Sequence, residues 1–135
     1  MNLHDPVSSI MTSPVTCIEP NQPLVELKHI YEKVHFHHHV PVTEDGMLVG
    51  VVSLIDFMRE VHHAGLDDKE AVYQATYVKD IMTSHPVSAE EETPIEEVAK
   101  KLVSGQFNSM IVTKNGKVSG IVTTADLVKL LLKTA

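Results

Sequence analysis

The 135 residues of this chain carry a formal net charge of -7, from 11 basic and 18 acidic side chains. This charge repels a phosphate backbone, and a chain with no Trp, three Tyr and three Phe has few rings on which bases can stack. Nucleic acid is therefore excluded as a main partner, and the length indicates one compact domain with a core of Val, Ile, Leu and Met.

The N-terminal residues and the single cysteine bear on the compartment. Residues 1–6 contain neither the basic nor the apolar segment of a secretory signal peptide, and no apolar run approaches the length that crosses a bilayer. Cys17 has no second cysteine with which to form an intrachain disulfide, which fits a reducing environment. We expect a soluble cytoplasmic protein with no membrane partner.

The first half of the chain predicts alternating strands and helices. Pro23 suits the first position of a helix, and Leu24 and Leu27 follow at helical spacing. Asp45 and Gly46 supply the positive φ angles of a tight turn between two β-rich runs. The expected elements are a strand at 15–18, a helix from Pro23, strands at 40–42 and 48–52, and a helix at 54–61.

The second half repeats this order with clearer markers. Thr93 and Glu96 have the spacing of a capping box around Pro94, which predicts a helix with Thr93 as its N-cap. Asn115 and Gly116 form a strong hairpin-turn pair. We expect a first lobe at 1–63, a linker at 64–79 with a short helix near 67–72, and a second lobe at 80–135.

Two segments of the first half recur in the second at a spacing of about 70 residues. Residues 10–16 (IMTSPVT) match 81–88 (IMTSHPVS), and residues 50–56 (GVVSLID) match 120–126 (GIVTTAD). Because this period is too long for a solenoid repeat, we expect an α+β fold of two β-α-β-β-α lobes related by a pseudo-twofold axis. Two copies of one polar motif also favour ligand binding in duplicate.

The second repeated motif places a hydroxyl and a carboxylate where a strand becomes a helix. Ser53 and Thr123 each end a strand, and Asp56 and Asp126 lie in the first turn of the next helix. Unpaired N–H groups there suit an anionic ligand, and the carboxylate can accept two ribose hydroxyls. The same spacing is that of an ordinary capping box, which needs no ligand. Its occurrence twice in one setting favours the ligand.

A tandem order of elements carries a family resemblance: Asp80-Ile81-Met82-Thr83, a short strand, a helix, a hairpin and Gly-x-x-Thr-x-x-Asp. It resembles the cystathionine β-synthase (CBS) domain pair, or Bateman module, over residues 7–132. The resemblance implies clefts for AMP, ADP, ATP or S-adenosylmethionine, with no required cofactor, and regulation of another, unknown protein rather than catalysis. It also implies association into a homodimer.

By position in that family, Asp56 and Asp126 would hold ribose hydroxyls, and Ser53 and Thr123 would face the ribose or phosphate. The other positions implied beside the ligand are Thr16 and Ser88 at its base and ribose end, and His38, Val40, Pro41, Asn108, Met110 and Ile111 along the wall. Ile111 departs from the family pattern, since the first copy has Pro41 there. No arginine is expected near either motif, and because arginine is the usual phosphate clamp, an AMP-like monophosphate or an uncharged tail is favoured over a triphosphate.

Eight of the nine histidines precede residue 64. His38 or His39 could donate to a ligand phosphate, more strongly when protonated below about pH 6.5. Alternatively, His35, His37 and His39 could hold zinc or nickel with a partner. A third interpretation is polar residues on a loop and strand edge. We assign no metal site, because no Cys or carboxylate completes a metal-ligand spacing.

Alternatives to ligand sensing use the same regions. A scaffold or constitutive dimerisation module would use both motifs as simple caps, and residues 127–132 offer an apolar stripe for a dimer contact. Gly50 and Gly120 would let a neighbouring backbone or a ligand approach the strand.

An enzyme is not expected, because no nucleophile, base and orienting group can be assembled, and Cys17 is expected to be a packed thiol.

Overall fold

The computed structural model describes residues 2–33, 38–63, 69–105 and 108–134. The chain forms two compact units, which we call lobes. The first lobe is Thr16–Pro86, and the second lobe is Met1–Val15 together with Val87–Ala135. The first fifteen residues therefore pack with the second half of the chain, so the lobes cut across the sequence repeats expected at 1–63 and 80–135.

The first lobe is built around one antiparallel hairpin. Its elements are α1 Leu24–Tyr31, β1 His39–Glu44, β2 Met47–Ser53, α2 Leu54–His63, α3 Lys69–Ala75, α4 Val78–Ile81 and β3 Thr83–Ser84. β1 and β3 both pair antiparallel with β2. The strand expected at 15–18 is reduced to an isolated parallel bridge between Ile18 and Val42, in which the Ile18 N–H donates to the Pro41 carbonyl oxygen and the Ile18 carbonyl oxygen accepts from the Thr43 N–H.

The second lobe has the same plan with a complete first strand. Its elements are the short 3-10 helix η1 Val7–Ser9, β4 Ser88–Glu90, α5 Ile95–Val103, β5 Ser109–Lys114, β6 Lys117–Thr123 and α6 Thr124–Thr134. β4 pairs parallel with β5, and β5 pairs antiparallel with β6. Thr12 adds an antiparallel bridge to Ile121. The mixed α+β fold in two lobes is confirmed.

Both hairpin turns form as the Asp-Gly and Asn-Gly pairs predict. The φ angles are 52° and 82° at Asp45 and Gly46, and 54° and 82° at Asn115 and Gly116. Positive φ at both central residues matches the turn to the twist of the strands. An irregularity also follows Val42 and Val112 in each hairpin, so the register is the same in both lobes.

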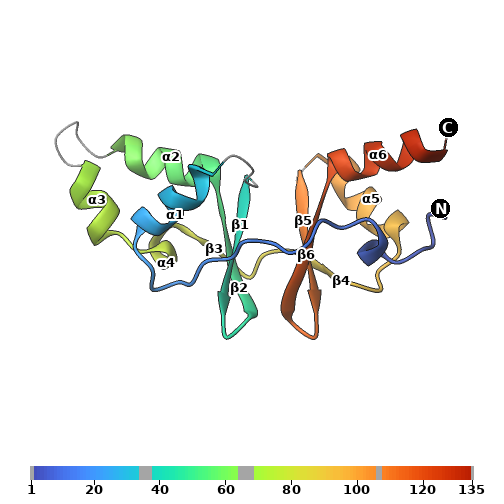
Figure 1. The fold of residues 1–135 in the computed structure, drawn as a ribbon, viewed down its shortest axis with the longest axis horizontal. Coiled ribbons are helices and arrows are strands. Elements are labelled where there is room, and N and C mark those ends of the chain that lie inside the picture. Colours follow the sequence, from blue (N-terminus) through green and yellow to red (C-terminus); the bar gives the residue numbers. More distant parts are fainter. Residues whose placement is uncertain (1, 34–37, 64–68, 106–107, 135) are drawn as a thin grey trace. The chain divides into compact units, whose positions relative to one another are not determined.

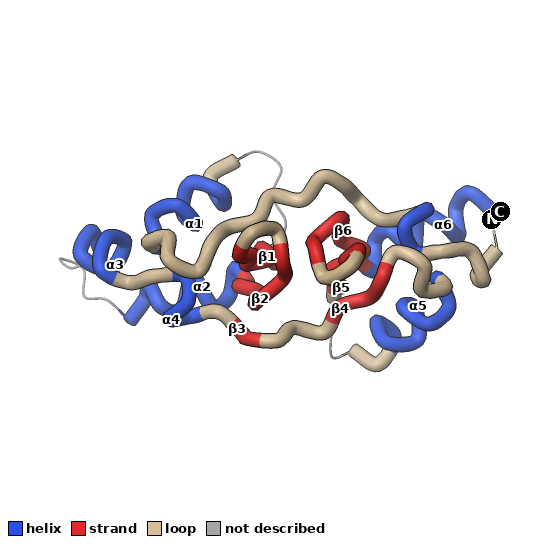
Figure 2. The backbone as a smooth tube through the Cα atoms, turned by 90° about the horizontal axis from the view of Figure 1, so that it is seen from below, coloured by secondary structure: helices blue, strands red, loops and turns tan. Residues whose placement is uncertain are grey.

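Each lobe buries its own apolar core between its helices and its strands. Figures 1 and 2 show α1 to α4 on one side of β1 and β2, and α5 and α6 on one side of β5 and β6. The first core contains Leu24, Leu27, Val40, Val52 and Phe57, among others. The second contains Val7, Val98, Leu102, Met110 and Val122, among others. A helix amphipathic along one face needs such a partner, and the hairpin supplies it.

The helix N-termini are capped by main chain from distant residues. The capping box expected at Thr93 and Glu96 does not form: Pro94 is the N-cap, without a side-chain cap bond. Instead the N–H groups of Ile95 and Glu96 donate to the carbonyl oxygens of Asp5 and Leu3, at 2.9 and 3.0 Å. These carbonyls satisfy amides that a side chain would otherwise have to cap.

The first lobe uses the same device with a different part of the chain. Pro23 is the N-cap of α1 rather than its first residue, and the Leu24 N–H donates to the Thr76 carbonyl oxygen at 2.9 Å. Val78 of α4 is fully buried in the first core, as Val7 of η1 is in the second. The segment before the first Ile-Met-Thr motif therefore packs in the second lobe. The segment before the second Ile-Met-Thr motif packs in the first lobe.

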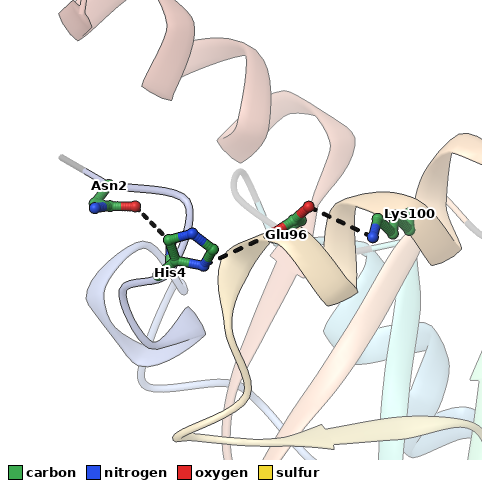
Figure 3. Close-up of polar contacts among 4 residues, drawn as sticks. All are labelled: Asn2, His4, Glu96 and Lys100. Atoms are coloured by element: carbon green, nitrogen blue, oxygen red, sulfur yellow. Dashed lines mark hydrogen bonds and ion pairs between the residues drawn. The ribbon is translucent and has the colours of Figure 1, made fainter.

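A polar side chain of the N-terminal segment also lies beside an acidic side chain of α5. Glu96 lies 3.7 Å from His4 Nδ1 and 3.4 Å from Lys100 Nζ, and the His4 N–H donates to Asn2 Oδ1 (Figure 3). All these side chains are substantially exposed, so each pair contributes little by itself.

The region expected to be a linker is largely helical where the structure describes it. α3 overlaps the short helix expected near 67–72, and residues 64–68 lie outside the described residues. α4 follows almost at once, with the Tyr77 N–H donating to Asp80 Oδ2 at 2.9 Å. Among the described residues, every helix is too short or too polar to span a membrane.

Candidate functional site

Each repeated hydroxyl-carboxylate motif lies at a strand-to-helix junction, as predicted. Ser53 ends β2 immediately before α2, and Thr123 ends β6 immediately before α6. Asp56 and Asp126 lie in the first turns of these helices. All four side chains are half-buried, so each junction combines one hydroxyl and one carboxylate with partial access to solvent.

At the second junction, the motif forms a complete capping box. Asp126 Oδ2 accepts from the Thr123 N–H at 2.9 Å and from Thr123 Oγ1 at 3.2 Å. The Asp126 N–H donates back to Thr123 Oγ1 at 3.3 Å. These bonds hold the hydroxyl and the carboxylate in fixed positions at the helix N-terminus, where negative charge is favoured.

At the first junction, only half of the capping box forms, and the Asp56 carboxylate lies beside a cation instead. The Asp56 N–H donates to Ser53 Oγ at 3.0 Å. Asp56 Oδ1 lies 3.6 Å from Arg59 Nη1, and the Asp56 side chain is 30% exposed. The expectation that no arginine lies near either motif is therefore wrong, because residues three apart share one helix face.

Backbone carbonyls bring two further candidate residues to the junctions. The His38 carbonyl oxygen accepts from the Leu54 N–H at 2.7 Å, and the Asn108 carbonyl oxygen accepts from the Thr124 N–H at 3.2 Å. Both side chains are exposed. His38 and Asn108 thus stand at equivalent places at the start of α2 and α6.

The apolar candidates divide between core and strand face. Val40 and Met110 are buried members of the two cores. Pro41 and Ile111 follow them and are also buried. Because side chains alternate along a strand, Pro41 and Ile111 lie on the opposite face of β1 and β5 from Val40 and Met110.

The strand register changes one assumed equivalence between the repeats. Ile18 pairs with Val42, and Ala89 pairs with Val112 in the same position of the second hairpin. The residue equivalent to Ser88 is therefore Cys17, and Thr16 lies one position earlier. The sequence already indicated this equivalence, because Cys17 and Ser88 are 71 positions apart, as are Pro23 and Pro94.

Cys17 is half-buried, and burial raises the pKa of its thiol above the ordinary value. The thiolate is the nucleophilic form of cysteine. A raised pKa therefore agrees with the packed thiol expected from the sequence.

The surroundings of His39 lower the pKa of its imidazole. Burial has the largest effect and the neighbouring His38 adds to it, whereas Asp56 acts in the opposite direction. Protonated His39 at a ligand phosphate would therefore require a pH below the ordinary range. His35 and His37 lie outside the described residues. Among those that are described, no group of three His, Cys, Asp or Glu side chains is placed to hold a metal ion.

In each repeated motif, a neighbouring segment of the chain packs against the glycine, so the space beside the glycine is not open. A Cβ at Gly50 would lie 2.7 Å from Met82 Sδ and 3.0 Å from the Thr83 carbonyl oxygen. A Cβ at Gly120 would lie 2.8 Å from Met11 Cγ and 3.0 Å from the Thr12 carbonyl oxygen. The methionines thus fill the space that each glycine leaves.

A cavity of about 240 Å³ lies beside the second junction, entirely within the second lobe. Its lining residues are Ser9, Ile10, Met11, Asp126, Lys129, Leu130 and Lys133. Of these, only Asp126 was expected at a site. The spacing of Asp126, Lys129 and Lys133 along one helix face could have indicated the lysines, but the N-terminal wall depends on the packing of residues 9–11 in this lobe.

Known proteins resemble the chain in sequence. The protein YlbB of Bacillus subtilis is 40% identical over 87 residues, which are 64% of this chain and 55% of YlbB. The chain covers 24% of the length of a second curated relative. It thus spans about half or less of these proteins.

Two solved structures share the fold over nearly the whole chain. The CBS domain pair of protein MJ0100, in complex with 5′-methylthioadenosine and S-adenosyl-L-methionine, is 25% identical, with a TM-score of 0.77 and coverage of 96% and 98% of the two chains. CBSX2 of Arabidopsis thaliana, in complex with AMP, is 26% identical, with a TM-score of 0.78 and the same coverage. The CBS domain family model matches residues 7–63 and 78–133, and the chain therefore belongs to the CBS domain family.

Proposed function

We propose that the chain is a non-catalytic regulatory module that binds an adenosine-containing ligand and transmits its presence to a partner or to its own oligomeric state. The observation that carries this proposal is the second junction, where Asp126, held by its hydrogen bonds with Thr123, lines a cavity. Relatives of the same fold were solved with S-adenosyl-L-methionine, 5′-methylthioadenosine and AMP. The lining of that cavity includes lysines and no arginine, and we therefore favour an AMP-like ligand over a triphosphate.

The proposed contacts follow the chemistry of each group. Asp126 accepts from ribose hydroxyls, since a carboxylate has more acceptor positions than the capping box uses. Thr123 and the N-terminal amides of α6 face the ribose or phosphate. Ser88, Asn108 and Ile111 are not among the residues that line the cavity, and we propose that they contact the part of the ligand that extends beyond it. In the first lobe we propose corresponding roles for Ser53, Asp56, Thr16, His38 and Pro41, with Val40 and Met110 supporting the walls from the cores.

The module's output is proposed to include dimerisation. Two helices expose large apolar side chains: Ile55 and Met58 on α2, and Val128, Leu131 and Leu132 on α6, with Leu131 69% and Leu132 73% exposed. Apolar side chains gathered on a surface are typical of interaction sites. A ligand can shift such an association only by its difference in affinity for the two states.

Calorimetric titration tests the proposal directly. Adenosine, AMP, ADP, ATP and S-adenosylmethionine are titrated into the wild-type chain and into Asp126→Asn and Asp56→Asn variants. We expect saturable heat for at least one compound and a loss of affinity in Asp126→Asn. Neither heat nor thermal stabilisation from any of them at millimolar concentration would refute the ligand-sensing function.

A second candidate function is a scaffold in which the motifs act only as helix caps. The complete capping box of Thr123 and Asp126 favours it. In that case Asp126→Ala lowers the free energy of unfolding by about 1 kcal/mol and leaves the dimerisation constant independent of added nucleotide. Sedimentation equilibrium with and without AMP distinguishes the two functions.

A further inference from the structure

We propose that Met11 is a site of reversible oxidation, at which a peroxide converts the thioether to a sulfoxide and thereby loosens the packing of residues 7–12 in the second lobe. Oxidation at this site needs no bound ligand, so its role is separate from the function proposed above. Three features support it: the contact of the side chain with a buried glycine, its access to the cavity of the second lobe, and the hydrogen bonds already formed beside it.

The Met11 side chain lies against the backbone of β6 at Gly120. Gly120 is buried, and a Cβ there would lie 2.8 Å from Met11 Cγ and would overlap Met11 Sδ. The first lobe repeats this contact, since a Cβ at Gly50 would lie 2.7 Å from Met82 Sδ. Each Ile-Met-Thr motif thus packs its thioether on a glycine, and a further atom between the sulfur and the strand displaces the side chain.

The Met11 side chain is open to a small oxidant. It is half-buried and is one of the side chains that line the cavity of about 240 Å³. Hydrogen peroxide is only slightly larger than a water molecule, whose share of liquid volume is about 30 Å³. The same lining includes Ser9, Asp126 and two lysines, which suit the entry of a polar oxidant.

The reaction is a two-electron oxidation that needs only the peroxide. A lone pair of Met11 Sδ attacks one peroxide oxygen, and an S–O bond forms as the O–O bond breaks. The second oxygen takes the proton of the transferred hydroxyl and leaves as water, so the sulfur is oxidised and the peroxide is reduced. The product is polar and chiral, where the thioether was apolar.

The new oxygen atom enters a place where the main-chain donors are already used. The Met11 N–H donates to the Val7 carbonyl oxygen at 3.1 Å. The Thr12 N–H donates to the Ile121 carbonyl oxygen at 2.8 Å, and the Ile121 N–H donates back to Thr12 at 3.0 Å. Met11 also packs against the second core, where a polar atom without a donor costs free energy. Oxidation therefore weakens the contact with Gly120 and, with it, the hold on the fully buried Val7.

The other methionines provide internal comparisons. Met110 is 2% exposed and belongs to the second core, so its oxidation should be slow. Met47 and Met58 are 42% and 58% exposed, so their oxidation should be fast and should have little effect on folding. Met82 has the same contact with a glycine in the first lobe and is therefore replaced in the test, which leaves Met11 as the methionine packed on a glycine.

Peroxide treatment of Met82→Leu, followed residue by residue with peptide mass spectrometry, tests the proposal. We expect the sulfoxide of Met11 to form well before that of Met110, and the Tm to fall by roughly 3 °C or more. The amides of Met11 and Thr12 should exchange with solvent faster in the oxidised protein. Methionine sulfoxide reductases for both sulfoxide epimers should restore the original Tm.

Matched variants assign the effect to one sulfur. Met11→Leu/Met82→Leu keeps a side chain of similar volume that peroxide does not oxidise, and its Tm should be unchanged by the treatment. Met58→Leu/Met82→Leu removes an exposed sulfur instead, and its Tm should fall as far as that of Met82→Leu.

Three results would each overturn the proposal. The first is a Tm that falls equally with and without Met11. The second is a Met11 sulfoxide that changes neither the Tm nor the amide exchange, and the third is a Met11 that stays reduced until Met110 is oxidised. If Met11→Leu/Met82→Leu does not fold, the amide exchange of oxidised Met82→Leu decides the question in protein that retains Met11.

Discussion

The contact between Gly120 and the N-terminal segment gives a quantitative test of how the second lobe is assembled. In Gly120→Ala, the new methyl group meets Met11 Cγ at 2.8 Å and the Thr12 carbonyl oxygen at 3.0 Å. That carbonyl is fixed, because it accepts from the Ile121 N–H at 3.0 Å, and the Thr12 N–H donates to the Ile121 carbonyl oxygen at 2.8 Å. The methyl group therefore cannot be accommodated by a small shift of the backbone.

The expected loss follows from two opposing effects. Overpacking of this kind costs about 1–3 kcal/mol, and alanine is preferred over glycine within a strand by about 0.5–1 kcal/mol. We expect the free energy of unfolding to fall by roughly 1–2 kcal/mol. Urea denaturation followed by circular dichroism measures this change, with the dependence on urea unaltered if the compact state is otherwise the same.

A double-mutant cycle with Met11→Ala identifies the cause. Removing the methionine side chain makes room for the new methyl group, so Gly120→Ala should cost less in that background, with a coupling of about 0.5 kcal/mol or more. Gly105→Ala is the control: its φ is +81° and nothing lies within 4 Å, so its cost comes from backbone strain and should not depend on Met11. An equal cost of Gly120→Ala in both backgrounds would refute the packing of Met11 on Gly120.

Three further predictions concern separate features. Val7→Ala and Val78→Ala should each lower the free energy of unfolding by roughly 2 kcal/mol, because Val7 is fully buried in the second lobe and Val78 in the first. A change below about 0.5 kcal/mol in urea titration would contradict this packing. His39→Gln should reduce the loss of stability on acidification. Because the pKa of His39 is lowered in the folded protein, the unfolded chain takes up this proton at a higher pH than the folded protein does. The free energy of unfolding of the wild type should therefore decline as the pH falls through about 6.5 and level off below the folded pKa. Thermal melts from pH 8 to pH 5, with the exposed His29→Gln as control, check this, and an unchanged pH profile in His39→Gln would count against it. Arg59→Ala should release Asp56 and change the free energy of unfolding by less than about 1 kcal/mol, because the pair is partly exposed; a larger loss by urea titration would show that Arg59 has a structural role beyond this pair.

Local sequence patterns determined much of each lobe. The Asp-Gly and Asn-Gly pairs specified both hairpin turns, since few other residues adopt positive φ at two successive positions. The duplicated motif placed Ser53, Asp56, Thr123 and Asp126 at strand-to-helix junctions. Such features depend on neighbours a few residues apart, so the sequence alone was sufficient to find them.

Long-range packing decided the rest. The caps of α1 and α5 come from Thr76, Asp5 and Leu3, and no local pattern predicts a main-chain donor-acceptor pair between segments so distant in sequence. The strand register showed that Cys17, not Thr16, is equivalent to Ser88. The pairing of Asp56 with Arg59 depends on which rotamers the side chains adopt on α2.

The amino-acid sequence by itself determined that this protein has two similar lobes, each with a hydroxyl and a carboxylate where a strand becomes a helix. Only the tertiary structure decided that residues 1–15 complete the second lobe and thereby form one wall of the cavity beside Asp126. The physical reason is that periodicity and turn preferences act over a few residues, whereas the burial of Val7 and the enclosure of a cavity depend on which distant segments exclude water from the same core.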